Sequence, residues 1–212
     1  MQLELKQIIV PPGNQLLLKD ITWPMFETLL TELGESRASR LSYSKGTLEI
    51  MVPLMEHEVS KVLISDLVKI ILEELDIEFW PLGSTTFKNQ KIAQGVEPDA
   101  CFYIQNEATV RGKNHIDLET DPPPDLAIEI NLTSRTQFNN YEALGVPELW
   151  RYNDRNLQIS VLQDAKYIQS DRSLQFPNFP ITELIPQYLQ QSKTAGRNVA
   201  MKAFRSWVKA QI

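Results

Sequence analysis

The sequence predicts a protein of the α/β or α+β class, with a β-sheet flanked by helices. Short runs that alternate apolar and polar residues, as strands do, recur along the chain. Between them lie a long stretch with apolar residues at helical spacing, residues 56–75, and a shorter one, residues 23–33. The 212 residues, 42% of them hydrophobic, are enough to bury a sizeable core. We therefore expect one sheet with helices packed on it.

The first part of the chain is expected to hold a strand, a short helix and a hairpin. The N-terminal residues alternate like a strand. The helix over residues 23–33 follows Thr22, a good N-cap, and ends at Gly34. Residues 40–53 form two alternating runs around Lys45-Gly46, which indicates a β-hairpin.

The rest of the chain is expected to consist mainly of strands. Residues 105–124 are polar, contain three consecutive prolines and are predicted to form a loop. Residues 136–152 indicate a short helix that runs into a strand. The strand regions are residues 77–90, 95–104 and 125–132, and residues 155–170 are predicted to form a closing β-hairpin. We expect a single domain over residues 1–192, followed by a basic helical tail over residues 193–212.

Composition excludes several classes of site. No segment approaches the roughly 20 apolar residues that span a bilayer. The N-terminus lacks the regions of a signal peptide, so we expect a cytoplasmic protein. One cysteine, Cys101, and two histidines exclude an internal disulfide, a cysteine-rich zinc site and a histidine-dominated metal centre. A bound metal would therefore need oxygen ligands.

Charge is distributed unevenly along the chain. The net charge of −6 argues against general binding of nucleic acid, which uses a basic surface to neutralise phosphates. Residues 193–212 nevertheless carry five basic residues and no acid. This tail offers either a local basic surface or an ordinary solvated helical face.

An acidic strand raises the main question of the sequence. In "PPPDLAIEINLTS", Asp125, Glu129 and Asn131 lie on one face of the predicted strand, opposite an apolar face. A buried carboxylate is costly unless it is paired, hydrogen-bonded or bound to a metal. Asp99 stands at the start of another strand, after Pro98. If the two strands are neighbours, Asp99 and Glu129 converge on one pocket, whereas Asp125 can simply cap a loop.

Two carboxylates have a definite chemical use in such a pocket. Together with a backbone carbonyl and water they suit Mg²⁺, which is commonly completed by phosphate oxygens of a substrate. A metal held in this way polarises the phosphate and activates water for attack. The pattern is thus compatible with hydrolysis of phosphodiester bonds.

Three blocks of sequence carry a resemblance to a known family. In order they are "GSTTF...GVEPDACFYI", "DLAIEI...TS" and "YEALGVPELWRY". They resemble the Uma family of bacterial restriction-endonuclease-like proteins, a domain of unknown function, over roughly residues 20–185. That family is assigned to the PD-(D/E)XK nuclease superfamily. The resemblance implies a restriction-endonuclease-like fold with a mixed central sheet, and a DNA endonuclease that uses Mg²⁺ or Mn²⁺.

The resemblance also assigns roles to residues. Asp99 matches the acid of the "PD" element and Glu129 the acid of the second strand, and these two would hold the metal with the carbonyl of Ile130. A Glu from the first core helix often joins them through water, which makes Glu56, His57 and Glu58 candidates.

Among those three candidates Glu58 is favoured, because Val62 at i+4 is expected to face the sheet. The alternative is ordinary enrichment of acids at a helix N-terminus.

The superfamily lysine is absent from both places where it is expected. The position two residues after Glu129 is Asn131, and the alternative position on the following helix, counted back from Tyr141, is Gln137. A neutral amide can orient water but adds no positive field. Lys88 or Arg135 can supply the missing charge, although a solvated lysine at a strand end needs no such role.

The sequence leaves three hypotheses open. The first is a metal-dependent DNA endonuclease with Asp99, Glu129 and Gln137 in the site, in which the basic tail meets the DNA backbone and two chains form a homodimer. The second is a catalytically silent module of the same fold that binds nucleic acid or a protein partner. The third is a structural hydrogen-bond network without phosphate chemistry. Thr85 and Thr86, after Gly83, are further candidates for contact with a phosphate.

Overall fold

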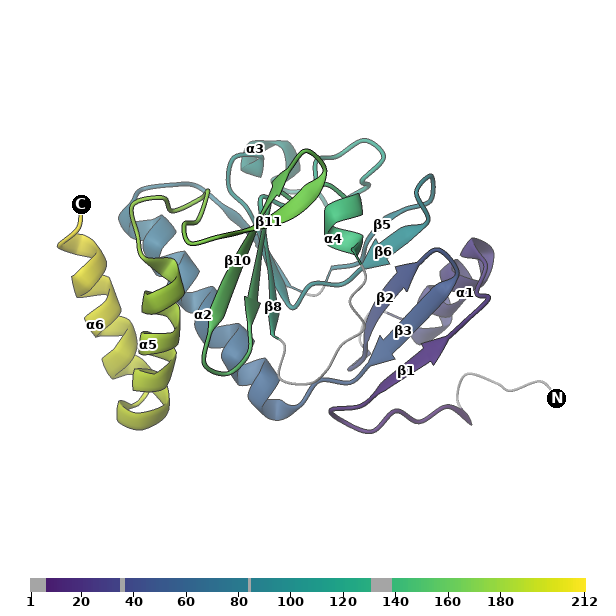
Figure 1. Cartoon of the computed structure of the whole chain (residues 1–212), viewed down its shortest axis with the longest axis horizontal. Helices are drawn as coiled ribbons and strands as arrows, with labels where there is room; N and C mark the ends of the chain where they lie inside the picture. The colour runs from purple at the N-terminus through teal and green to yellow at the C-terminus, as the bar shows by residue number, and fades with distance from the viewer. Residues whose placement is uncertain (1–6, 35–36, 84, 131–138) are drawn as a thin grey trace.

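The structure is a computed structural model that describes residues 7–34, 37–83, 85–130 and 139–212. Within these residues the strands form two sheets, and no helix combines the length and the apolar character that crossing a membrane requires (Figure 1). In spatial order, the first sheet contains β1 (Gln15–Leu18), β3 (Thr47–Met51), β2 (Arg40–Ser44), β6 (Gln94–Val96) and β5 (Phe87–Asn89). The second contains β11 (Lys166–Ser170), β10 (Leu157–Gln163), β9 (Glu148–Tyr152), β8 (Leu126–Ile130), β7 (Ala100–Tyr103) and β4 (Trp80–Leu82). The helices are α1 (Trp23–Leu33), α2 (Met55–Glu74), α3 (Glu107–Val110), α4 (Asn140–Ala143), α5 (Ile181–Ala195) and α6 (Arg197–Lys209).

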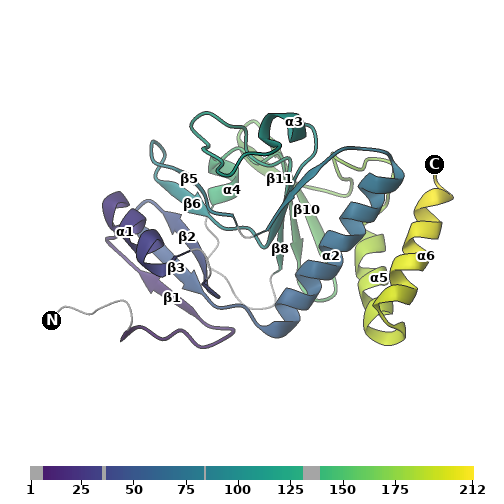
Figure 2. The ribbon, with the colours of Figure 1, turned by 180° about the vertical axis from the view of Figure 1, so that it is seen from behind.

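The second sheet is mixed and is covered by helices on one face. Its strands pair antiparallel except β8 and β9, which are parallel. The alternate residues Leu126, Ile128 and Ile130 of β8 share a core with Leu67 and Ile71 of α2. Helices α5 and α6 lie beside α2 and extend this layer (Figure 2). The predicted mixed central sheet flanked by helices is confirmed.

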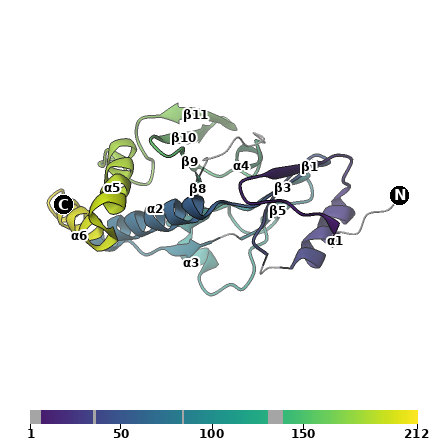
Figure 3. The same ribbon diagram turned by 90° about the horizontal axis from the view of Figure 1, so that it is seen from below.

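The first sheet was not anticipated as a separate layer. It packs against α1, where Phe26 stacks on Tyr43 with ring centroids 4.6 Å apart. The helix begins as predicted, since Oγ1 of Thr22 accepts a hydrogen bond from the amide of Met25 at 3.4 Å. Figure 3 shows α1 and β1 at the opposite end of the molecule from α5 and α6.

Local turn chemistry determines both hairpins. Lys45 and Gly46, between β2 and β3, have φ values of 44° and 92°, as a two-residue turn with two left-handed positions requires. Asp164 and Ala165 do the same between β10 and β11, with φ values of 48° and 58°. Both predicted hairpins are confirmed. The predicted loop over residues 105–124 differs in one respect, because it contains the single turn of α3.

The basic tail contains the end of α5 and all of α6, and these two helices form a helical hairpin. It breaks at Gly196, whose φ of 96° suits glycine, and α6 packs against α2. Four of its five basic residues form ion pairs with acids of the body: Lys193 with Glu56 and Asp154, Arg197 with Asp66, Arg205 with Glu73 and Glu74, and Lys209 with Glu74. Much of its positive charge is therefore neutralised. Residue 193 lies within α5, and the division of the chain at 192/193 stays a prediction.

Candidate active site

Of the two predicted metal ligands, Glu129 lies on β8 and Asp99 immediately precedes the neighbouring strand β7. Strands β7 and β8 pair antiparallel with Ala100 opposite Ile128, and continuing this register by one pair places Asp99 opposite Glu129. Residues directly opposite each other have Cα atoms about 4.5–5.5 Å apart. The side chains are 1% and 5% exposed, respectively, and Oδ2 of Asp99 accepts a hydrogen bond from the amide of Ile130 at 2.8 Å. The structure thus brings Asp99, Glu129 and Ile130 together.

His57 is the residue of α2 that reaches this pair. Its Nε2 lies 3.5 Å from Oδ2 of Asp99, and the side chain is 3% exposed. His57 belongs to the buried stripe of α2, with Ser60, Ile64 and Leu67 at helical spacing after it. When protonated, the imidazole forms an ion pair with Asp99.

Glu58, the favoured candidate on α2, points to other partners. Its carboxylate binds Nζ of Lys61 at 2.7 Å and Nη2 of Arg40 at 3.3 Å. Burial acts to raise the pKa of Glu58, but the hydrogen bond and charge of Lys61, with the charges of Arg40 and His57, outweigh it and lower the pKa. The expectation that Val62 faces the sheet is wrong, since Val62 is 51% exposed. A role for Glu58 in the site stays a prediction.

Tyr141 holds the second carboxylate. Its buried hydroxyl donates a hydrogen bond to Oε1 of Glu129. In the sequence, Tyr141 serves only as the residue from which the position of Gln137 is counted. The signal that was missed is chemical, because a buried tyrosine hydroxyl needs a polar partner and the acidic face of β8 offers one.

The side chain of Asn140 fixes α4, which carries Tyr141, to the first sheet. Its amide nitrogen donates to Oγ of Ser42 at 2.9 Å, to the carbonyl of Tyr43 at 3.1 Å and to the carbonyl of Gly95 at 2.8 Å. Asn140 is 1% exposed. It is the second positioning residue that sequence reasoning missed.

Lys88, one candidate for the missing positive charge, is paired with an acid of α1. Nζ of Lys88 lies 2.5 Å from Oε2 of Glu27 on α1. Asn131, Arg135 and Gln137 lie outside the described residues.

A cation that the sequence did not suggest stands beside Glu129. Arg151 of β9 is its register partner in the parallel pair β8 and β9. Burial lowers the pKa of Arg151, but a guanidinium stays charged at neutral pH. Its Nη1 lies 3.5 Å from Oγ of Ser160. The residue was overlooked because the parallel pairing of β8 with β9 is a long-range contact.

Asp125 has a structural role, the loop cap that the sequence suggested as the alternative to a place in the pocket. It accepts hydrogen bonds from the amide of Ile104 at 2.7 Å and from the amide of Asn106 at 3.1 Å. This carboxylate caps the loop after β7. The alternative of a loop cap is confirmed.

Donor chemistry decides whether a metal suits the site. Within the described residues, no group of three or more His, Cys, Asp and Glu side chains is arranged to hold an ion. Mg²⁺ needs only one or two carboxylates, because it keeps several waters. Asp99 and Glu129 repel each other when both are ionised, and a cation held between them removes this repulsion. The two carboxylates and the carbonyl of Ile130 therefore fit a hard divalent ion by donor type.

The family and the solved structure that resemble this chain are both described as nucleases. Residues 23–193 match the Uma2 family model, described as "Putative restriction endonuclease". No curated protein matches the chain. A solved structure from Anabaena variabilis ATCC 29413, titled as a "putative nuclease belonging to DUF820", is 12% identical, with a TM-score of 0.43 over 84% of this chain and 96% of that chain. The family description supports a nuclease, and hence a hydrolase with a nucleic-acid substrate. Because the family model spans most of the sequence, the chain belongs to the Uma2 family.

Proposed function

We propose that this chain is a metal-dependent endonuclease that hydrolyses DNA phosphodiester bonds at the centre formed by Asp99 and Glu129. The observation that carries the proposal is a pair of nearly inaccessible carboxylates, Asp99 immediately before β7 and Glu129 on the neighbouring strand β8. The membership of a restriction-endonuclease family supports phosphate chemistry at this pair.

Residues of the chain would hold the metal and keep the ligands in place. Asp99, Glu129 and the carbonyl of Ile130 would bind Mg²⁺ or Mn²⁺, which when bound polarises the scissile phosphate and acidifies water. The amide of Ile130 and the imidazole of His57 orient Asp99, and the hydroxyl of Tyr141 orients Glu129. Partners of this kind fix ligand geometry and commonly change metal affinity or activity about 10–100-fold when removed.

The role of the absent lysine falls to other groups. Arg151 stands beside Glu129 and supplies positive charge next to the centre. Gln137, at the alternative lysine position, would orient the attacking water, and Glu58 would act through water. Lys88 would have to leave Glu27 to take part.

A catalytically silent module is the second candidate function. It is favoured by the two amides, Asn131 and Gln137, at the lysine positions and by the net charge of −6. Such a module would keep the fold and bind nucleic acid or a protein partner.

One set of assays separates the two functions. Supercoiled plasmid is incubated with wild type, Asp99→Asn, Glu129→Gln and the control Glu183→Gln, an exposed acid on α5, in Mg²⁺ or Mn²⁺. Calorimetry measures Mn²⁺ binding by the same proteins. The endonuclease predicts that both site variants lose cleavage by more than about 100-fold and lose Mn²⁺ binding, whereas the control does not.

Two other results would contradict an active endonuclease with this centre. Cleavage that persists in folded Asp99→Asn overturns the proposed centre. No cleavage by wild type, with gain of cleavage in Gln137→Lys, identifies the silent module. The homodimer is part of the proposal, and light scattering tests it against the 24.3 kDa mass of one chain.

A further inference from the structure

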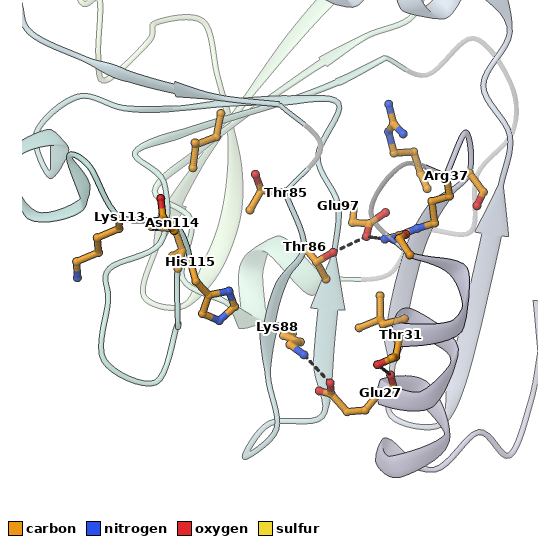
Figure 4. A pocket seen from close by; sticks show the side chains of 16 residues that line it. Glu27, Thr31, Arg37, Thr85, Thr86, Lys88, Glu97, Lys113, Asn114 and His115 are labelled. Carbon is orange, nitrogen blue, oxygen red and sulfur yellow. Dashed lines mark hydrogen bonds and ion pairs between the residues drawn. The ribbon is translucent and has the colours of Figure 1, made fainter.

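The molecule contains a polar pocket of about 500 Å³ (Figure 4). It opens between α1, the segment that leads into β5, and the loop that carries His115. Its volume falls in the range of small-molecule sites, roughly 300–1,000 Å³.

Two residues of the pocket are linked through the sequence to residues of the centre. Glu97 lines the pocket two residues before Asp99. Arg40 also lines it and contacts Glu58, the residue that follows His57.

Charge in the pocket is opposite to that of the whole chain. Four cationic side chains line it with only two carboxylates, whereas the chain has a net charge of −6. Most of these cations have an acid of their own: Arg37 pairs with Glu97, Lys88 with Glu27 and Lys113 with Asp121.

Arg40 is the exception among the four cations. It shares the carboxylate of Glu58 with Lys61, which lies closer, at 2.7 Å against 3.3 Å. Its Nε, like that of Arg37, is buried and has no acceptor within the described residues. Two cations on one carboxylate leave a local positive surplus, and an anion with several oxygens can satisfy it.

The neutral lining adds hydrogen-bond donors and an apolar side. In the part of the chain that the structure describes, the side chains of Ser39, Thr85 and His115 make no hydrogen bond to the protein. Leu82 and Ile116 supply apolar surface. In Figure 4, His115 stands on the loop across the pocket from Arg37. Cationic and hydroxyl donors together with apolar and ring surface match the phosphate and the base of one nucleotide.

We propose that this pocket binds a single nucleotide, with its phosphate at Arg40 and its base against His115, Leu82 and Ile116. For a nucleotide that is part of a DNA strand, this inference rests on the proposed function. It then specifies the substrate of the endonuclease as unpaired DNA. A concave pocket of this size accepts an unpaired base and not a base pair inside a duplex. The chain therefore prefers single strands or frayed ends.

The test measures binding without cleavage. Fluorescence anisotropy in EDTA follows a labelled 12-nucleotide single strand, its duplex, and competition by a deoxynucleoside 5′-monophosphate. The variants are Arg40→Gln, His115→Ala, which lies in an exposed loop, and the control Arg172→Gln, an exposed arginine. Thermal unfolding verifies that each variant folds.

The single strand is expected to bind more tightly than the duplex, and the monophosphate to compete. Arg40→Gln is expected to weaken binding about tenfold, from the loss of a charged hydrogen bond, and to reduce the salt slope by about 0.7. His115→Ala is expected to weaken binding, whereas Arg172→Gln is not. If the single strand binds more tightly than the duplex but the monophosphate does not compete, the pocket recognises a nucleotide only as part of a strand. This result also supports the inference.

Equal or tighter binding of the duplex, or unchanged binding by both Arg40→Gln and His115→Ala, overturns the inference. Cleavage that depends on Asp99 would then still support the endonuclease. Nucleotide binding without cleavage supports the pocket and not the endonuclease.

Discussion

The amide of Asn140 attaches α4 to the first sheet, and its replacement tests how the site is held. The two hydrogens of its NH₂ group are shared among three acceptors, Ser42 and Tyr43 on β2 and Gly95 on β6, and the side chain is almost fully buried. Asn140→Ala removes these bonds and leaves polar groups without a partner. At about 1 kcal/mol for each net hydrogen bond, we expect a loss of about 2–3 kcal/mol in the free energy of unfolding.

Asn140→Asp is the sharper change, because it keeps the shape and reverses the polarity. The introduced carboxylate would face two carbonyls and a hydroxyl, and an uncompensated buried charge costs about 3–5 kcal/mol. Urea unfolding followed by circular dichroism measures the effect. With a slope of about 2 kcal/mol per molar, a loss of 3 kcal/mol lowers the midpoint by about 1.5 M. Protonation restores a donor, so the deficit is expected to shrink as the pH falls.

The neighbouring residue provides a matched control. Asn139 is exposed, and Asn139→Asp makes the same chemical change one position earlier. We expect its free energy of unfolding to stay within about 0.5 kcal/mol of the wild-type value, as is usual for surface substitutions. Equal midpoints for the two aspartate variants would refute the bridging role of Asn140.

Three further predictions use other parts of the fold. Cys101 is fully buried and burial raises the pKa of its thiol, so iodoacetamide at pH 8 is expected to alkylate it only in denaturant, as mass spectrometry would show. Gly95→Ala would place a Cβ 3.0 Å from the buried ring of Phe26 and is expected to cost about 1–3 kcal/mol, whereas Gly83→Ala meets nothing within 4 Å and should leave the urea midpoint unchanged. The pKa of Glu58 is lowered, so its contribution to stability is present above pH 4.5 and is lost as the pH falls through the folded pKa. Glu58→Gln should therefore flatten the acid limb of a plot of stability against pH, and an unchanged slope would contradict this.

Local signals in the sequence predicted individual elements well. The turn at Lys45-Gly46, the cap at Thr22 and the alternation of β8 each depend on a few neighbouring residues. The partition of strands into two sheets depends on long-range pairing instead. Strands β4 and β5 are separated by four residues, yet β4 pairs with β7 and β5 with β6. Nothing in their composition distinguishes the two destinations.

The same division applies to the candidate site. Asp99 and Glu129 could be proposed from residue type and resemblance, and the register of β7 and β8 brings them together. His57 and Glu58 are consecutive residues of α2, so the choice between them depends on which face of the helix is buried. Val62 indicated the wrong face, because it is apolar but exposed. Sequence pattern gives a helical face only when its apolar residues are buried.

The position of the two sheets relative to each other determines the geometry of the proposed centre. Glu129 belongs to the second sheet, but its hydroxyl partner Tyr141 stands on α4, which Asn140 attaches to the first sheet. A shift of the first sheet would therefore move the hydroxyl away from the carboxylate without altering either residue. It follows that Asn140→Ala should reduce cleavage, or metal affinity, under conditions where the variant remains folded. Tyr141→Phe should reproduce that loss with less effect on stability, because it leaves the attachment of α4 intact.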